Sequence, residues 1–314
     1  MKDASKEYHG KKKNKWKVFC KNFPLTLMAL PGILLIFVFN YIPLFGLILP
    51  FKDYKYSDGF WGSKWVGFRN FRYLFESKDM IVATRNTILY NFVFIVIGTI
   101  ASVTLALMLF ELSKKAVKFY QTSMILPYFI SWVVVAFIVN SLLDADRGII
   151  NHTLIKLGKE GILWYNNPKY WPVILLLSSI WKGAGYSAVI YYAALMGLDQ
   201  ECYESAYLDG ASRFKQVWYI SIPGIKSMIT IMVIMSIGNV LRGDFGLFYN
   251  VPLNSSLLYS TTDVIDTFIY RALLNLGDIG MSSAAGFYQS CVGFLLILIT
   301  NAVVRKVDSD SALF

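Results

Sequence analysis

Long apolar stretches alternate with polar segments along the chain, and six of them are long enough to cross a membrane. A hydrocarbon layer about 30 Å thick needs roughly 20 predominantly apolar residues in a helix. The stretches cover residues 23–50, 86–109, 120–143, 171–196, 224–240 and 283–304. The pattern predicts an all-α integral membrane protein with about six transmembrane helices.

The composition supports this prediction. Of the 314 residues, 56% are hydrophobic and 16% are charged. A soluble domain of this size needs more charge to cover its surface. The first apolar stretch also contains four prolines, which kink membrane helices and free carbonyls that neighbouring helices must satisfy. A soluble protein is therefore excluded, and the first span is expected to be bent.

Basic residues give the expected orientation. The formal net charge is +10, and many lysines crowd into the first 21 residues, just before the first span. Such flanks mark the cytoplasmic side and attract anionic lipid. Basic residues also lie in the loop after the second span and in the 197–223 loop. We expect a multi-pass protein of the cell membrane with both termini in the cytoplasm, in contact with lipid and not with nucleic acid.

Three segments follow from this topology. Residues 1–23 form a basic cytoplasmic segment, residues 24–306 the transmembrane domain, and residues 307–314 a cytoplasmic tail. The connection between the fourth and fifth spans, residues 199–223, is the most informative part of the transmembrane domain.

No catalytic or metal-binding pattern is visible in the sequence. The phosphate-binding motif G-x-x-x-x-G-K-[ST] is absent, so the chain has no visible ATP site of its own. His9 and His152 have no Cys or acidic partner at metal-ligand spacing, and no disulfide framework is seen among Cys20, Cys202 and Cys291. We expect neither an enzyme nor a metal protein, and no cofactor in this chain.

The 199–223 loop is predicted to start as a short helix. Asp199 is a suitable N-cap, and Glu204 lies near the positive end of the helix dipole. Asp209 and Gly210 are expected to end this helix, because glycine readily adopts a turn with positive φ.

A second short helix is expected directly after that turn. Ser212 is a suitable cap, and Phe214, Val217 and Trp218 give the helix an apolar face that fits the membrane surface. Pro223 is expected to end it and to begin the next span. The loop is thus predicted to be a helix–turn–helix element on the cytoplasmic side.

The same residues resemble the EAA loop of ABC importer permeases, whose pattern is Glu-Ala-Ala, then Asp-Gly-Ala, then Ile-x-Leu-Pro. Ser205 replaces the middle small residue of this pattern and Ile222 replaces the leucine. The matching positions are Glu204, Ala206, Asp209, Gly210, Ala211, Ile220 and Pro223.

This resemblance implies a role for the loop. In that family the first short helix is a coupling helix that docks into a cleft of an ATPase subunit. Glu204 would then pair with a basic residue of the ATPase, and Gly210 would make the turn. The residues implied in coupling are Glu204, Ala206, Tyr207, Asp209, Gly210 and Ala211.

Further segments resemble the complex-polysaccharide permeases of the carbohydrate uptake branch, namely residues 238–252, 261–273 and 282–306. The resemblance implies a bacterial permease subunit that forms half of the membrane path for an oligosaccharide. It also implies a second homologous permease, two ABC ATPase subunits that hold ATP and Mg²⁺, and an extracellular substrate-binding lipoprotein.

A sugar path needs aromatic faces and polar groups inside the membrane. Lys182 is expected near the bilayer centre, where a lysine is costly unless it faces water or a partner. Trp181 precedes it, and Tyr186 lies one turn further on the same face. The alternative is a lysine satisfied by carbonyls or by an acidic side chain of a neighbouring helix.

Other candidates lie in or near the spans. Arg242 and Asp244 either pair with each other or meet the substrate or the binding protein. Polar residues in membrane helices often only join helices, and this alternative stays open for the remaining candidates. These are Trp132, Asn140, Asn239, Tyr288 and Gln289.

Two other functions stay open at this stage. One is a permease of the same superfamily with a non-sugar cargo such as a peptide or an anion. The other is a channel or ion-coupled carrier that works without an ATPase, although the internal repeat common in such carriers is not visible.

Overall fold

The computed structural model describes residues 15–307. Most of the predicted basic segment (residues 1–14) and residues 308–314 of the predicted tail lie outside the described residues. The chain divides into two compact units, the first ending at Leu49 and the second beginning at Pro50. Throughout the described part the elements are helices, apart from two very short strands.

The first unit is one long helical stretch. Helix α1 (Lys15–Ile36) continues into a π-helical turn (Phe37–Tyr41) and then into a 3₁₀ stretch (Ile42–Phe51) whose end belongs to the second unit. The helix type changes ahead of Pro43, where proline removes a backbone donor and collides with the carbonyl four residues earlier. Residues Thr26–Phe51 are long and apolar enough to span a membrane, as expected for the first span.

Two strands and two short helices form the connection to the second span. Strand β1 (Lys52–Asp53) pairs antiparallel with β2 (Lys64–Trp65), and helices α2 (Gly59–Gly62) and α3 (Arg69–Glu76) accompany them. Gly59 has φ +65°, a backbone conformation that glycine adopts without strain.

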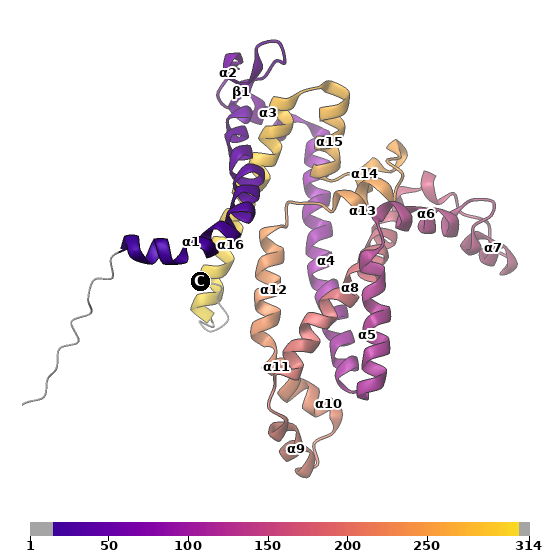
Figure 1. Ribbon diagram of the computed structural model, residues 1–314. Helices are drawn as coiled ribbons and strands as arrows, with labels where there is room; N and C mark the ends of the chain where they lie inside the picture. Colours follow the sequence, from indigo (N-terminus) through magenta and orange to yellow (C-terminus); the bar gives the residue numbers. More distant parts are fainter. Residues whose placement is uncertain (1–14, 308–314) are drawn as a thin grey trace, which may run out of the picture. The chain divides into compact units, whose positions relative to one another are not determined.

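The centre of the second unit is built from long helices in mutual contact. Helix α4 (Lys78–Phe110) packs along α8 (Trp171–Met196), α5 (Lys114–Phe129) packs along α8, and α12 (Lys226–Gly238) contacts α16 (Ile279–Val307) (Figure 1). A Cβ at Gly185 of α8 would collide with the backbone of α5, so glycine permits this close crossing.

The third predicted span is a broken helix, and a bend lies at the start of the fifth. Within residues 15–307, four helical stretches could cross a membrane by themselves, and the number rises to six if each bent pair counts as one span. Helix α5 is followed by α6 (Trp132–Leu143) at an angle of 96°, and Arg213–Gly224 meets α12 at 58°. Counting each bent pair as one span gives the predicted number of about six.

The third span, expected as one helix over 120–143, is therefore interrupted. Helix α5 ends at Phe129, Ile130 is extended, and the Ser131 hydroxyl accepts a hydrogen bond from the Val134 N–H (3.4 Å) as N-cap of α6. Pro127, two residues before the helix end, lacks a backbone donor and weakens this last turn.

Short helices fill the connections between the long ones. These short helices are α7 (Ile149–Lys156), α9 (Gln200–Leu208), α10 (Arg213–Gln216), α11 (Ile222–Gly224), α13 (Phe245–Asn250), α14 (Tyr259–Thr262) and α15 (Ile265–Leu276), with a π turn at Val217–Ser221 and 3₁₀ turns at Trp164–Asn166, Pro168–Tyr170 and Ser256–Leu258. Helix α15 packs against α4 and α16, and α13 packs against α6 and α8.

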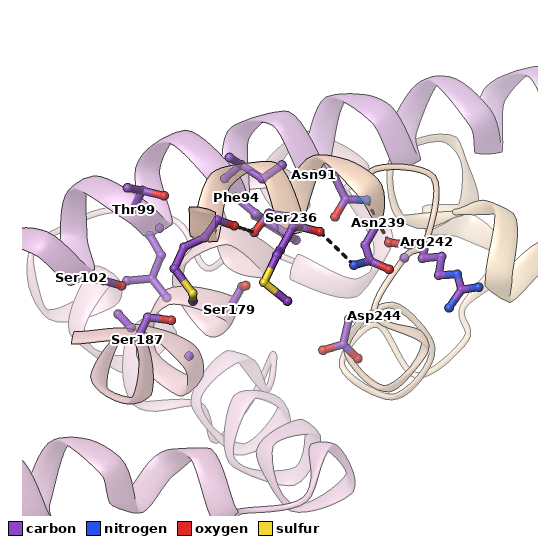
Figure 2. A pocket seen from close by; sticks show the side chains of 18 of the residues that line it. Asn91, Phe94, Thr99, Ser102, Ser179, Ser187, Ser236, Asn239, Arg242 and Asp244 are labelled. Carbon is purple, nitrogen blue, oxygen red and sulfur yellow. Dashed lines mark hydrogen bonds between the residues drawn. The ribbon is translucent and has the colours of Figure 1, made fainter. Parts of the chain in front are cut away.

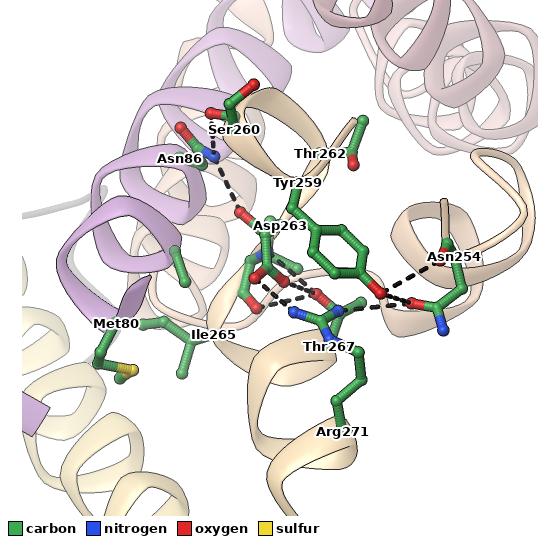
Figure 3. A network of polar contacts seen from close by, with 12 residues as sticks. Met80, Asn86, Asn254, Tyr259, Ser260, Thr262, Asp263, Ile265, Thr267 and Arg271 are labelled. Atoms are coloured by element: carbon green, nitrogen blue, oxygen red, sulfur yellow. Dashed lines mark hydrogen bonds and ion pairs between the residues drawn. The ribbon is translucent and has the colours of Figure 1, made fainter. Parts of the chain in front are cut away.

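A buried ion pair holds the start of α15 (Figure 3). The carboxylate of Asp263 accepts from the Arg271 guanidinium at 2.5 Å and from the Thr267 hydroxyl at 2.7 Å. Its backbone carbonyl accepts from the Asn86 side chain of α4 at 3.0 Å. The Arg271 guanidinium also lies 4.0 Å from the centre of the Tyr259 ring. Burial raises the pKa of Asp263, while Thr267 and Arg271 act to lower it.

Candidate functional site

A polar cavity of about 560 Å³ lies among α4, α8 and α12 (Figure 2). Charged side chains, those of Arg242 and Asp244, occur at one end of it. Hydroxyl and amide groups supply most of the remaining polar lining, from Asn91, Thr99, Ser102, Ser179, Ser187, Ser236 and Asn239. Such groups exchange hydrogen bonds with a neutral polar ligand without the cost of burying a charge.

Helical periodicity explains why these residues gather. On α8, Ser179, Gly183 and Ser187 recur every four residues, so they share one face. On α12, Ser236 and Asn239 are three residues apart and face the same space. The helices remain apolar elsewhere, and the cavity arises where their small polar faces converge.

The chain unwinds directly after α12, and a side chain of α4 holds this turn. The Asn91 amide donates hydrogen bonds to the carbonyls of Val240 and Arg242, each at 3.0 Å. A carbonyl freed at a helix end must find a donor when no water is available. Asn91 supplies it to two carbonyls at once.

Side chains of α15 and α16 hold the same turn from other directions. The Gln289 amide donates to the Leu241 carbonyl at 2.7 Å and to the Asp266 carboxylate at 3.2 Å. The same carboxylate accepts from the Gly243 N–H at 2.5 Å. Burial raises the pKa of Asp266, and these two hydrogen bonds act against that rise. Gln289, a predicted path residue, thus joins helices and does not line the cavity.

Arg242 and Asp244 are not paired with each other. The Asp244 carboxylate accepts from the Trp132 indole at 2.8 Å and from the Leu247 N–H at 3.2 Å, which makes it the N-cap of α13. The Arg242 guanidinium is exposed and lies 3.4 Å from the Ser290 hydroxyl. Of the two alternatives for Arg242 and Asp244, the mutual ion pair is therefore not formed between these two described residues.

Lys182 lies at the break between α5 and α6. Its ammonium donates to the Tyr128 carbonyl at 2.6 Å and to the Pro127 carbonyl at 3.5 Å, and its nitrogen lies 5.4 Å and 5.3 Å from the ring centres of Tyr128 and Trp132. Tyr186 stacks on Tyr128 with centroids 4.4 Å apart. The alternative in which carbonyls satisfy the lysine is the one that the structure shows.

Replacing Lys182 should destabilise the junction between α5 and α6. Lys182→Met leaves two helix-end carbonyls without their donor, and we expect a loss of about 1–3 kcal/mol in the free energy of unfolding. Lys182→Arg keeps donors and charge and should retain most of the stability. Thermal unfolding of both purified variants in detergent measures the difference. An unchanged midpoint for Lys182→Met would contradict this role.

The remaining predicted path residues lie elsewhere. Tyr288 packs edge-on against Phe75 at 5.7 Å, Trp181 is about half exposed, and Asn140 is half-buried on α6. Of the ten predicted, the cavity lining includes Asn239, Arg242 and Asp244. Sequence reasoning missed Asn91 and the serines of α8, although their spacing of four residues within an apolar span was a usable signal.

The connection from α8 to α12 forms the two predicted short helices. Asp199 accepts from the Glu201 N–H at 2.9 Å and caps α9, and Ser212 accepts from the Lys215 N–H at 3.5 Å and caps α10. Gly210 has φ +75° between them, as predicted. Pro223 lies within α11, and the break before α12 falls at Ile225, later than expected.

Contacts with α4 fasten this pair of helices to the membrane helices. The Tyr203 ring lies 5.5 Å from the Phe110 ring, and its hydroxyl shares a hydrogen bond of 2.9 Å with Ser221. Arg213 forms an ion pair with Glu111 at 3.3 Å. Burial raises the pKa of Tyr203. These contacts link α9 and α10 to the C-terminal end of α4.

Several side chains of α9 are exposed around a hollow beside these contacts. Tyr207 is 69% exposed and Leu208 is 85% exposed, and Glu204 is exposed beside them. Together with Arg213 they line a hollow of about 450 Å³. A tyrosine and a leucine presented with a carboxylate around a hollow are typical of a protein contact surface.

A helical membrane domain with an internal polar cavity and a fastened, exposed helical pair is the architecture of a transport subunit. The chain belongs to the family of binding-protein-dependent transport system inner membrane components, whose model matches residues 80–309. The matched region contains both the cavity and the α9–α10 pair, so the ABC importer resemblance drawn from the loop is confirmed.

Known relatives and a solved structure support the same family assignment. Protein LplB of Bacillus subtilis (strain 168) is 34% identical, covering 95% of this chain and 91% of that protein. The polygalacturonan/rhamnogalacturonan transport system permease protein YteP of the same strain is 34% identical, covering 91% and 89%. A crystal structure of a bacterial ABC transporter involved in the import of the acidic polysaccharide alginate matches with a TM-score of 0.85 and 32% identity, covering 94% of this chain and all of that one.

Proposed function

We propose that this chain is the permease subunit of an ATP-driven importer and forms half of the membrane path for an oligosaccharide. The polar cavity among α4, α8 and α12 carries the proposal. Sugars present many hydroxyl groups, which hydroxyl and amide side chains such as those of Ser179, Ser236 and Asn239 bind by hydrogen bonds. The relatives named for polysaccharide transport support the same cargo class.

The implied assembly has several subunits. A second, homologous permease completes the path. ATP and Mg²⁺ belong to two ATPase subunits, and an external lipoprotein delivers the sugar. A related alginate importer was crystallised with its oligosaccharide-bound periplasmic protein, which supports the delivery step.

Coupling runs through α9 and its exposed face. Glu204 and Tyr207 dock on the ATPase, and Tyr203 with Arg213 passes the movement on to α4. Closure of the ATPase dimer around ATP moves α9 and α10 together, which closes the inner side of the path and opens the outer side. In this proposal α9, both chain termini and the ATPase lie in the cytoplasm of a bacterial cell.

A double variant tests the coupling role. Glu204→Ala with Gly210→Val removes a docking charge and places a β-branched residue at φ +75°. Truncating one partner of a buried charge pair costs about 2 kcal/mol or more, roughly thirtyfold in affinity. We expect the reconstituted complex to lose both uptake and the stimulation of ATP hydrolysis by the loaded binding protein.

The chain offers a matched control outside this loop. Gly158 has φ +73° with open space around it, and Glu160 is an exposed glutamate nearby. Glu160→Ala with Gly158→Val makes the same chemical changes away from α9 and should keep uptake near the wild-type rate. Normal uptake by the Glu204→Ala, Gly210→Val complex would refute the coupling role.

A further inference from the structure

The Arg242 guanidinium lies at the end of the cavity and forms no ion pair with a carboxylate of the described residues. Figure 2 shows Arg242 beside Asn239 and Asp244 at that end. The Asp244 carboxylate is already occupied by the Trp132 indole and by the Leu247 N–H. Within the described residues, the Arg242 guanidinium donates one long hydrogen bond, at 3.4 Å, to the Ser290 hydroxyl. The charge of Arg242 is thus available to a ligand.

Other acidic groups near Arg242 do not neutralise it. The Asp266 carboxylate faces the same turn, but it binds the Gly243 N–H and the Gln289 amide and lies outside ion-pair distance of the guanidinium. Asp266 still attracts Arg242 electrostatically. Apart from the bond to Ser290, the five N–H donors of the guanidinium have no acceptor among the described residues.

The backbone of Arg242 is held in place from both sides. Its own carbonyl accepts from Asn91 of α4, and the following N–H, that of Gly243, donates to Asp266 of α15. The preceding carbonyl, that of Leu241, accepts from Gln289 of α16. Three helices therefore fix the base of one flexible side chain, which is the arrangement expected of a binding residue with a preorganised support.

We infer that Arg242 recognises a carboxylate on the cargo as it enters the cavity, so that the cargo is an acidic, uronate-containing oligosaccharide. The planar guanidinium matches a carboxylate with two parallel hydrogen bonds, which a lysine does not reproduce. The uncharged lining beyond Arg242 then accepts the sugar hydroxyls. This inference rests on the proposed function and names its substrate class.

Uptake by the complete reconstituted complex with its binding protein tests this assignment. The labelled probes are trigalacturonate, trimannuronate, their methyl esters, which lack the charge at the same length, and neutral maltotriose. The wild type should take up at least one uronate on the order of ten times faster than its ester, because a charged hydrogen-bond pair is lost in the ester. Raised salt should reduce this preference.

Variants at this position isolate the contribution of the permease from that of the binding protein. Arg242→Gln should bring the ratio of uronate to ester uptake close to one, and Arg242→Lys should keep an intermediate ratio. Arg147→Gln, which removes an exposed arginine outside the cavity lining, should leave the ratio unchanged.

Three outcomes would overturn the assignment. They are a wild type that prefers maltotriose or the esters, an Arg242→Gln complex that keeps the wild-type ratio, and an equal loss of acid and ester uptake in that variant. Failure of every probe to enter would instead count against the oligosaccharide path itself, so the two failures are distinguishable.

Discussion

A tryptophan at position 183 is expected to abolish uptake while leaving the transporter assembled. Gly183 lies on the cavity face of α8, and a Cβ placed there meets no atom within 4 Å. The indole of Gly183→Trp therefore projects into a cavity of about 560 Å³ and occupies the space that a sugar must cross. Uptake should fall to the background of empty liposomes, whereas stimulation of ATP hydrolysis by the binding protein should persist.

The same substitution on another face of α8 serves as the control. Leu177 is 61% exposed on the outside of the helix, and Leu177→Trp should transport at a rate close to wild type. Transport by the Gly183→Trp complex at the rate of the Leu177→Trp complex would show that the cavity is not the path.

Loss of Arg271 is expected to give the largest loss of stability. Its ion pair with Asp263 is buried, with the two side chains 16% and 6% exposed. Arg271→Met leaves the Asp263 carboxylate buried without its cation, at a cost of about 3–5 kcal/mol. We expect the thermal unfolding midpoint of the purified protein in detergent to fall by roughly 10 °C.

A double variant that removes both charges shows how much of the lost stability comes from the unpaired carboxylate. Asp263→Asn with Arg271→Met leaves no uncompensated charge, so the double variant should recover much of the stability lost by Arg271→Met. Arg72 and Glu76 form an exposed ion pair, and Arg72→Met should change the midpoint little. Equal midpoints for Arg271→Met and Arg72→Met would contradict the importance of the buried network.

Local chemistry made several elements predictable from the sequence. The predicted span 171–196 coincides with α8, because the segment from Trp171 to Met196 is predominantly apolar and has polar segments on both sides. Asp199 and Ser212 cap α9 and α10 as expected, and Gly210 makes the turn. Caps and turns depend on a few neighbouring residues, so the sequence alone indicates them.

Contacts between residues far apart along the chain could not be predicted from the sequence. The third span was expected to be continuous, but Lys182 of α8 supplies the donor that allows α5 to end at Phe129. That partner is more than 50 residues away along the chain. Gln289 was similarly expected to line the path, and it binds instead to the turn after α12, whose position no local pattern reveals.

The cavity was also missed for a physical reason. Single polar residues in a span are common, and only their alignment on three helices makes a site. Asn91, Ser179 and Ser236 lie far apart in the sequence and converge because α4, α8 and α12 pack together.

Photo-crosslinking from position 207 in living cells tests the central claim most directly. Tyr207 lies on the exposed face of α9, and a photoreactive phenylalanine there reports which protein that face touches. We expect an adduct with an ATPase subunit, and none when the same probe replaces Leu177 on the outside of α8. An adduct with an extracellular protein alone, or no protein adduct at position 207, would contradict the claim that α9 receives the force of ATP hydrolysis in the cytoplasm.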